Sequence, residues 1–337
     1  ATELGEGMKT TQVQLAATPI GVPLEENFRL AEIELHVPGE GELLCETLFL
    51  SLDPYMRSQI SGRHISGAVQ PGEGMRGETI SRVVESRAEA FSQGDLVRVP
   101  GGWQAHSVHA AAEVARVPDS RLSPSYYLSA LGMPGLTAYA GLIWQAQPVA
   151  GDTVLIPAAT GGVGALAGQL ARAASCQVIG IAGGPEKCRL AVEELGYHAC
   201  IDRLADDVPA ELDRLCPDGI DVFFDLVGGE LLHRVCERLA VGARVVLCGM
   251  MAEYNSPERL PGPPPALWII ARATVYGLVV YDFEGRRDEF VAAVTPMLAS
   301  GEVKVLEDRV RGLERAPALF CKLMRGENCG KAVVELG

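Results

Sequence analysis

Several features are absent from this 337-residue sequence, and each absence excludes a class of protein. The nine cysteines contain no C-x-x-C pair, although zinc sites and disulfide frameworks normally show such close spacing. No apolar run reaches membrane-spanning length, and the first residues show no signal-peptide core. Repeats and low-complexity segments are also missing. We therefore expect a cytoplasmic globular protein with reduced, mostly buried cysteines and no membrane partner.

An excess of positive charge is lacking as well. The chain has 29 Lys and Arg against 43 Asp and Glu, for a net charge of −14. Nucleic-acid phosphates would be repelled by such a chain, so we expect no nucleic-acid partner. The length is sufficient for two domains, each with its own hydrophobic core.

The most informative stretch of the sequence, residues 152–187, has the pattern of a strand, a turn, a helix and a second strand. Thr153 to Ile156 form a short β-branched apolar run, typical of a strand buried on both faces. From Val163 to Ala173 small and aliphatic residues recur at helical spacing, and Gln177 to Ala182 form a second apolar run. This order predicts a βαβ unit of a parallel sheet.

Three glycines, Gly161, Gly162 and Gly164, lie between the first strand and the helix. We expect Gly161 to permit the tight turn and Gly164 to let the helix approach the strand. Backbone N–H groups at the helix N-terminus would then bind a pyrophosphate. A Gly-rich turn can also be merely structural, but its position between strand and helix favours a dinucleotide site.

The end of the second strand indicates which dinucleotide is bound. An NAD site has an acid about twenty residues after the turn, and this chain has Ala182 followed by two glycines there. Glu186 follows Pro185 at the expected start of a helix, where the helix dipole favours an acid whether or not a cofactor binds. The cations Lys187 and Arg203 would instead suit a 2′-phosphate, which favours NADPH. The alternative is that both are solvated surface charges.

The whole chain predicts two domains and a returning tail. Residues 1–128 show short alternating runs punctuated by Gly and Pro, typical of a barrel-like antiparallel β domain. Residues 129–298 continue the strand–helix alternation through six strands, which predicts a Rossmann doubly wound parallel sheet. Residues 299–337 return to short strands and one helix, and we expect them to rejoin the first domain.

Individual elements follow from the same patterns. We expect strands at 199–202, 221–226, 243–247 and 273–280, and helices at 126–144, 185–195, 230–239 and 286–300. Residues 255–268 contain five prolines, so we expect a loop over the active site there.

With these elements in place, a family resemblance can be stated. Ordered segments from residue 50 to 331 resemble the zinc-independent medium-chain dehydrogenase/reductases with a GroES-like first domain, and most closely the prostaglandin reductase (leukotriene B4 12-hydroxydehydrogenase) branch. The matching segments are LSLDPYMR, LGMPGLTAYAGL, AATGGVG, FFDLVGGE, CGMMAEYN, LPGPPP, LVVYDF and GENCGK. The resemblance implies an NADPH-dependent oxidoreductase that reduces the carbon–carbon double bond of α,β-unsaturated ketones and aldehydes.

The resemblance also implies roles for particular residues. The cofactor would be held by Gly161, Gly162, Val163, Gly164, Lys187, Arg203, Cys248, Gly249, Tyr254, Leu278, Val279, Val280 and Asn328. Leu226 departs from the family, which commonly has Asn there, so one cofactor hydrogen bond is in doubt.

Negative charge develops on the substrate oxygen in such a reaction, and a hydrogen-bond donor must stabilise it. Tyr254 is the first candidate for the catalytic donor, and Tyr55 is the second; Tyr55 and its neighbours could equally form a packed corner. Tyr254 could instead only orient the cofactor ribose. We expect no metal, because His106 and His109 would lie on opposite faces of a strand and the zinc-ligand motif Gly-His-Glu is replaced at residues 76–79 by Arg-Gly-Glu-Thr.

Two other functions are compatible with the same glycine turn. One is NADPH:quinone oxidoreduction, as in zeta-crystallin-like relatives, and the other is a non-catalytic NADPH-binding protein. The family resemblance further suggests a homodimer formed at a sheet edge near residues 275–280.

Overall fold

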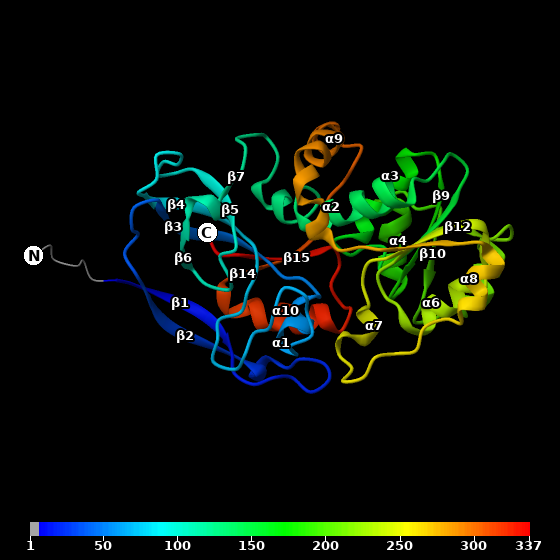
Figure 1. Cartoon of the computed structure of the whole chain (residues 1–337), viewed down its shortest axis with the longest axis horizontal. Helices are drawn as coiled ribbons and strands as arrows, with labels where there is room; N and C mark the ends of the chain where they lie inside the picture. Colours follow the sequence, from blue (N-terminus) through cyan, green and yellow to red (C-terminus); the bar gives the residue numbers. More distant parts are fainter. Residues whose placement is uncertain (1–6) are drawn as a thin grey trace, which may run out of the picture. The chain divides into compact units, whose positions relative to one another are not determined.

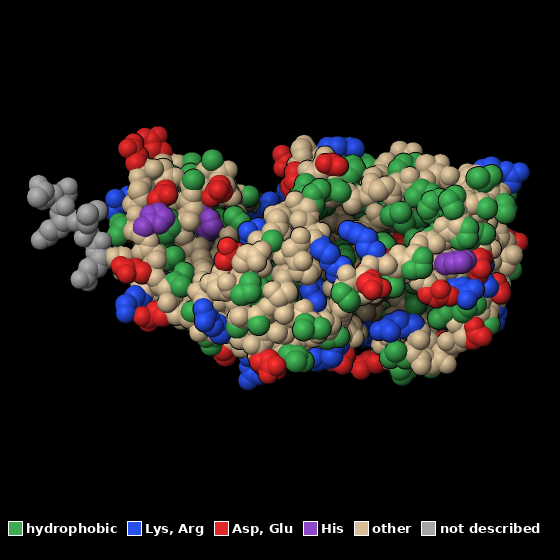
Figure 2. All heavy atoms as spheres, turned by 60° about the horizontal axis from the view of Figure 1, so that its bottom comes forward, with side chains coloured by type: hydrophobic (Ala, Val, Ile, Leu, Met, Phe, Trp, Pro, Cys, Tyr) green, Lys and Arg blue, Asp and Glu red, His purple; other side chains and the backbone are tan. Residues whose placement is uncertain are grey.

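The computed structural model describes residues 7–337, which form two compact units. The first unit comprises the chain through Leu128 together with Asp308–Asn328 and Ala332–Gly337. The second unit comprises Ser129–Glu307 and Cys329–Lys331. Figure 1 shows the strands and helices of both units. On the face shown in Figure 2, acidic and basic side chains are interspersed rather than separated by sign.

The first unit is built from β-strands in two sheets. One sheet is the antiparallel pair β1–β2, and the other has the order β14-β15-β3-β4-β5-β7, with β6 paired to β3. The strands are β1 (Met8–Leu15), β2 (Phe28–Leu35), β3 (Glu42–Ser51), β4 (Thr79–Ser86), β5 (Leu96–Val99), β6 (His106–Ala110), β7 (Ala115–Arg116), β14 (Glu307–Arg311) and β15 (Lys331–Glu335). Strand β15, in the last part of the chain, pairs with β3 of this sheet.

Short helices complete the first unit. They are η1 (Glu25–Asn27), α1 (Met56–Ile60), η2 (Ala111–Glu113), η3 (Pro124–Leu128), η6 (Leu313–Arg315) and α10 (Ala316–Met324). One apolar core cluster combines residues from β3, β4 and β5: Leu43, Cys45, Val83, Val97 and Val99. Phe28, Trp103 and Phe320 form a second packed group, with ring centroids 5.5–5.8 Å apart.

The second unit contains a six-stranded sheet in the order β10-β9-β8-β11-β12-β13. All the recorded pairs in it are parallel, which confirms the doubly wound sheet predicted from the sequence. The strands are β8 (Thr153–Pro157), β9 (Gln177–Ala182), β10 (Ala199–Asp202), β11 (Ile220–Asp225), β12 (Leu239–Leu247) and β13 (Thr274–Gly277).

Helices cover both faces of this sheet. They are α2 (Met133–Tyr139), the π-helix η4 (Ala140–Ala146), α3 (Gly164–Ala173), α4 (Pro185–Glu193), α5 (Val208–Leu215), α6 (Gly229–Cys236), α7 (Met251–Tyr254), α8 (Pro265–Ala271), η5 (Val280–Arg286) and α9 (Arg287–Ser300). Leu155 packs in one core cluster with side chains of α5, α6 and α8. Because side chains alternate along a strand, its neighbours Val154 and Ile156 face the other side, where α3 packs on β8.

Some boundaries predicted from the sequence were wrong. Residues 255–268 are not all loop, because α8 begins at Pro265, and proline is favoured at the first position of a helix. The strand predicted over 273–280 ends at Gly277, where its pairing with β12 ends. The helix predicted over 126–144 is divided into η3, α2 and η4, and Gly132 is extended at the start of α2. Helix α5 was not predicted at all.

Candidate nucleotide-binding and catalytic site

The glycine turn joins β8 to α3, as predicted, but its strained residue is not a glycine. Ala158 has a φ of 49°, in the left-handed region, whereas Gly161, Gly162 and Gly164 do not. The space for Gly161 in the turn is nevertheless limited: a Cβ there would lie 3.3 Å from the Ala158 carbonyl oxygen, which is tighter than most such contacts. At Gly164 a Cβ would overlap that same oxygen, so the close approach of helix and strand depends on Gly164.

The N-terminus of α3 has the properties of an anion site. The helix has ten residues, and no side chain within residues 7–337 caps its N-terminus. The first N–H groups of a helix lack intrahelical partners, and the helix dipole is positive at that end. Gly161, Gly162 and Val163 are half-buried, so the turn is accessible. The residues present therefore fit a dinucleotide pyrophosphate.

Tyr197 supports this turn from within the core. Its hydroxyl donates a 2.8 Å hydrogen bond to the Gly164 carbonyl, and the side chain is only 1% exposed. A Cβ at Gly168, one helical turn further along α3, would overlap the Tyr197 ring. Burial raises the pKa of Tyr197 well above its ordinary value, so the hydroxyl remains a donor.

Lys331 is a functional candidate that the sequence analysis missed. It is only 3% exposed, and its Cδ would lie 3.1 Å from a Cβ placed on Gly162. Its backbone N–H donates to the Leu306 carbonyl at 2.9 Å. The GENCGK segment contains Lys331, but no local pattern indicates that the returning chain lies against the glycine turn.

Two cations were predicted to bind a 2′-phosphate beyond β9. The guanidinium of Arg203 lies over Gly183, since a Cβ there would be 3.0 Å from its Nη2. Lys187 lies in the first turn of α4, whose N-cap, Gly184, has a φ of 98° that favours glycine. Asp202 is the nearest acid on the neighbouring strand, but its Oδ1 already accepts from the N–H groups of Gly184 and Leu204 at 2.8 and 3.0 Å.

The end of β12 leads into the segment that carries Tyr254. The backbone N–H groups of Cys248 and Gly249 donate to the Asp225 carbonyl at 3.0 and 3.1 Å. Tyr254 lies on the four-residue helix α7, and its hydroxyl oxygen accepts from the Met250 N–H at 3.3 Å. Burial raises its pKa, and it also raises the pKa of Cys248 to about 12. Both groups therefore stay neutral at physiological pH.

Two backbone groups of Leu278–Val280, a segment predicted to bind the cofactor, are hydrogen-bonded within the protein. The Leu278 N–H already donates to the Leu247 carbonyl at 3.0 Å, and the Val279 carbonyl accepts from the Asp282 N–H at 3.1 Å. These two groups are engaged within the protein, because the chain leaves β13 at this point and turns into η5. Leu226, at the position where the family commonly has Asn, is 6% exposed.

The remaining predicted site residues, Tyr55 and Asn328, belong to the first unit. Tyr55 precedes α1, and its ring stacks on that of His64 with centroids 4.9 Å apart. His109 shares a face of β6 with Ser107, to which it is bonded at 2.8 Å, and not with His106, as predicted. Within residues 7–337, no three His, Cys, Asp or Glu side chains are grouped as metal ligands would be.

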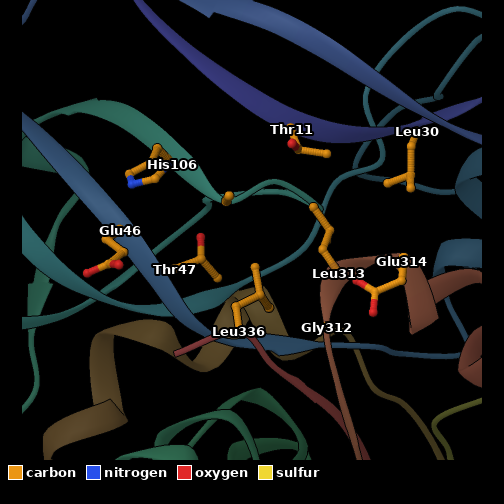
Figure 3. A pocket seen from close by; sticks show the side chains of 10 residues that line it. Thr11, Leu30, Glu46, Thr47, His106, Gly312, Leu313, Glu314 and Leu336 are labelled. Carbon is orange, nitrogen blue, oxygen red and sulfur yellow. The ribbon is translucent and has the colours of Figure 1, made fainter.

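A hollow of about 320 Å³ lies within the first unit (Figure 3). Figure 3 shows side chains from separate strands and from the turn at 312–314 pointing toward it. The lining residues are Thr11, Leu30, Glu46, Thr47, Ala105, His106, Gly312, Leu313, Glu314 and Leu336. None of the residues predicted to bind the cofactor or substrate lines this hollow, so we assign it no role in the reaction.

A two-unit chain with a parallel sheet and a glycine turn of this kind defines an oxidoreductase of the dinucleotide-binding class. Family models agree: residues 11–117 match the N-terminal domain of oxidoreductase, and residues 162–299 match a model described as zinc-binding dehydrogenase.

Curated relatives are similar over nearly the whole chain. The chain is 40% identical to the NADPH-dependent curcumin reductase of Escherichia coli, covering 96% of this chain and 95% of that protein. It is 35% identical to prostaglandin reductase 1 of Bos taurus (94% and 96%) and to the NADP(+)-dependent 2-alkenal reductase of Nicotiana tabacum (98% and 98%).

One solved structure, CurA from Vibrio vulnificus in complex with NADPH, superimposes with a TM-score of 0.92 at 39% identity, covering 97% of this chain and 99% of that one. The chain therefore belongs to the zinc-independent medium-chain dehydrogenase/reductase family of double-bond reductases. No helix among residues 7–337 is long and apolar enough to cross a membrane.

Proposed function

We propose that this protein is an NADPH-dependent reductase of the carbon–carbon double bond in α,β-unsaturated ketones and aldehydes. Three relatives named as curcumin, prostaglandin and 2-alkenal reductases support the reaction class, and two of those names specify NADPH or NADP(+). The observation that carries the proposal is the hydrogen bonding of Tyr254, a neutral hydroxyl at the carboxyl end of the parallel sheet.

The cofactor is proposed to bind along the carboxyl ends of β8 and β9. The uncapped N-terminus of α3 would hold the pyrophosphate, and Lys187 and Arg203 would hold the 2′-phosphate. Oδ1 of Asp202 accepts from two backbone N–H groups, so this oxygen is already engaged in the turn after β10. When bound, NADPH supplies the hydride that is added to the β-carbon of the enone.

Tyr254 is proposed to stabilise the charge that develops on the substrate oxygen. The Met250 N–H donates to the tyrosine oxygen, so the hydroxyl hydrogen of Tyr254 is left for a different acceptor. Because burial raises the pKa of Tyr254, the hydroxyl is protonated throughout the neutral range. A neutral donor of this kind can bind an enolate oxygen without a metal ion. Tyr55 is kept as a second candidate for this role or for the pocket wall.

The test is NADPH oxidation across a series of α,β-unsaturated carbonyl compounds of graded size, with NADH in parallel. Tyr254→Phe should lower kcat by about 10²-fold, the usual effect of losing one donor to a developing oxyanion. Its Kd for NADPH should change much less. Tyr276→Phe, in β13 of the same unit, is the matched control and should keep normal kinetics. If Tyr254→Phe weakens NADPH binding and leaves kcat unchanged, Tyr254 only orients the cofactor.

Quinone reduction is the second candidate function. An ortho-quinone assayed beside an enone separates the two, because a quinone reductase would oxidise NADPH faster with the quinone. Tight NADPH binding without turnover of any enal, enone or quinone would instead indicate a non-catalytic NADPH-binding protein.

We also propose a homodimer formed through the exposed edge of the sheet. Among the described strands, β13 is the last of the sheet and has β12 as its one neighbour. Ile269 and Ile270 on α8, which packs on β12, are 75% and 68% exposed. Light scattering should give twice the monomer mass for the native chain, and an Ile269→Glu/Ile270→Glu variant should be monomeric.

The domain roles and the location in the cell belong to the same proposal. Residues 1–128 would form the catalytic domain, 129–298 the NADP-binding domain and 299–337 the return to the catalytic domain. Five of the nine cysteines are buried (Cys45, Cys176, Cys216, Cys236 and Cys321), which supports a reducing, cytoplasmic location.

A further inference from the structure

A buried carboxylate closes the turn that follows β11. Asp225, the last residue of the strand, is completely buried. Its Oδ1 accepts two backbone hydrogen bonds, from the N–H groups of Val227 and Gly228, both at 2.9 Å. Gly228 has a φ of 70°, and the following Gly229 has a φ of 58°. The side chain of Asp225 therefore determines how the peptide planes of this turn are oriented.

Helix α7 is attached to that turn through its first N–H groups. The Met251 N–H donates to the Leu226 carbonyl at 3.3 Å, and the Ala252 N–H donates to the Val227 carbonyl at 3.0 Å. In the described part of the chain no side chain caps α7, so the turn supplies the acceptors for its first N–H groups. A rotation of the turn would move these acceptors, and the helix would have to move with them.

The backbone of Asp225 also holds the residues that precede α7. Its carbonyl oxygen accepts from the N–H groups of both Cys248 and Gly249. A Cβ on Gly249 would lie 3.0 Å from the Leu226 carbonyl oxygen, so the two loops are in close contact. Tyr254 is the last residue of α7, and its hydroxyl is bonded to Met250 at the start of this short segment.

We propose that Asp225 is a positioning residue, which holds the turn at 226–228 and thereby holds α7 so that the Tyr254 hydroxyl faces the reacting oxygen. The inference rests on the proposed function, in which Tyr254 is the hydrogen-bond donor. Asp225 itself touches neither substrate nor cofactor in this proposal and acts through two backbone hydrogen bonds.

The second carboxylate oxygen of Asp225 makes the proposal testable with a conservative variant. Oδ2 is buried and has no hydrogen-bond partner among the described residues. In Asp225→Asn the retained oxygen can still accept from Val227 and Gly228, and the amide nitrogen takes the place of Oδ2. Asp225→Ala removes both hydrogen bonds. The positioning role therefore predicts that Asn is tolerated and Ala is not.

Steady-state kinetics of the full chain with NADPH and an enone form the first test. Asp225→Ala should lower kcat by about tenfold or more, because small displacements of a catalytic group are costly. Asp225→Asn should retain most of kcat. Asp221→Ala is the matched control: Asp221 is also on β11, and its carboxylate accepts from the Thr153 N–H at 2.8 Å, away from α7. It should keep normal kcat.

A double-mutant cycle with Tyr254→Phe separates the inference from the proposed function. If Asp225 acts through Tyr254, Asp225→Ala should cause little further loss of kcat when Tyr254 is already Phe. Full additivity of the two losses would overturn the inference and leave the role of Tyr254 intact. A normal kcat for Tyr254→Phe alone would overturn the proposed function.

A second measurement needs neither substrate nor cofactor. The protein contains eight tyrosines, which can be replaced by 3-fluorotyrosine, and the ¹⁹F resonance of Tyr254 is identified by its loss in Tyr254→Phe. In Asp225→Ala this resonance should move to the position of an exposed tyrosine and titrate at lower pH. Asp225→Asn and Asp221→Ala should leave it in place.

Gly249→Ala tests the same contact with Asp225 intact, should Asp225→Ala fail to fold. The added Cβ would push against the Leu226 carbonyl, so the Tyr254 resonance should shift as it does in Asp225→Ala. An unchanged Tyr254 resonance in both variants, or an equal loss of kcat in Asp225→Asn and Asp225→Ala, would overturn the positioning role.

Discussion

The burial of Asp225 should make the stability of the second unit depend on pH in a direction opposite to most acids. Burial raises the pKa of Asp225 from 3.8 to about 6, although the N–H groups of Gly228 and Val227 partly offset this. The other titratable groups that face it are Cys236, Cys248 and Tyr254, and each has a raised pKa. These three stay neutral between pH 4 and pH 8, so Asp225 titrates alone.

The sign follows from proton binding. The folded state binds the Asp225 proton more tightly than the unfolded state does, so the contribution of this group to stability is complete below the unfolded pKa of 3.8. It is lost as the pH rises through about 6. A difference of about two pKa units corresponds to about 3 kcal/mol at 1.36 kcal/mol per unit. Asp225→Asn cannot ionise, so it should not lose this stability.

The assay is urea unfolding of the cofactor-free chain under reducing conditions at several pH values. The fluorescence of Trp144 and Trp268, both in the second unit, reports its unfolding. The unfolding free energy of Asp225→Asn, minus that of the native chain, should rise by about 2–3 kcal/mol between pH 4 and pH 8, because part of the effect is already lost at pH 4. Asp221→Asn, on the same strand, is measured in parallel. A flat difference for Asp225→Asn would mean that the carboxylate is solvated or paired, and the reasoning from its burial would be wrong.

Three further predictions concern the nucleotide site. Gly164→Ala should destabilise the protein by about 1–3 kcal/mol and weaken NADPH binding, because the added Cβ overlaps the Ala158 carbonyl oxygen. Thermal unfolding with and without NADPH measures the stability and the binding, and an unchanged unfolding temperature in both conditions would contradict the close approach of helix and strand. Lys187→Ala and Arg203→Ala should each raise the Kd of NADPH about tenfold and leave the Kd of NADH unchanged. Isothermal calorimetry measures both constants, and an equal loss of affinity for the two cofactors would rule out a 2′-phosphate role. Tyr197→Phe should lower the unfolding free energy by about 1 kcal/mol in urea, and a neutral effect would mean that its hydrogen bond contributes nothing.

The sheet of the second unit could be predicted because its strands carry their own signal. Strands buried on both faces consist of continuous apolar residues, such as Val222, Phe223 and Phe224, all fully buried. The order of strands then follows from the alternation with helices and the handedness of the crossovers. The glycine turn and the strand ends beyond it were located for the same reason, since they are defined by the adjacent strand.

Helices α5 and α8 were missed although the sequence carries a signal for each. Asp207 caps α5 by accepting from the Ala210 N–H at 3.2 Å, and Pro209 lies in the first turn. Pro265 begins α8, but together with the neighbouring prolines it also matches the pattern of a loop. At the start of a helix the missing N–H of proline costs nothing, so Pro209 and Pro265 are compatible with the first turns of α5 and α8.

Other features of the site have no local signal. Ala158 adopts the left-handed conformation between β8 and α3, a position where glycine would be expected. Lys331 reaches Gly162 from a segment more than 160 positions along the chain. Such contacts depend on the tertiary structure, so residue spacing could not indicate them.

The chemistry at the end of β11 and β12 follows from burial more than from any single residue. Burial favours the neutral forms of Cys248 and Tyr254, and the Asp225 carboxylate raises the pKa of both further. A hydroxyl that resists ionisation is poorly suited to give up its proton completely, but it donates a hydrogen bond over a wide pH range. The surroundings of Tyr254 therefore support the proposed role of its hydroxyl as a hydrogen-bond donor to an enolate oxygen.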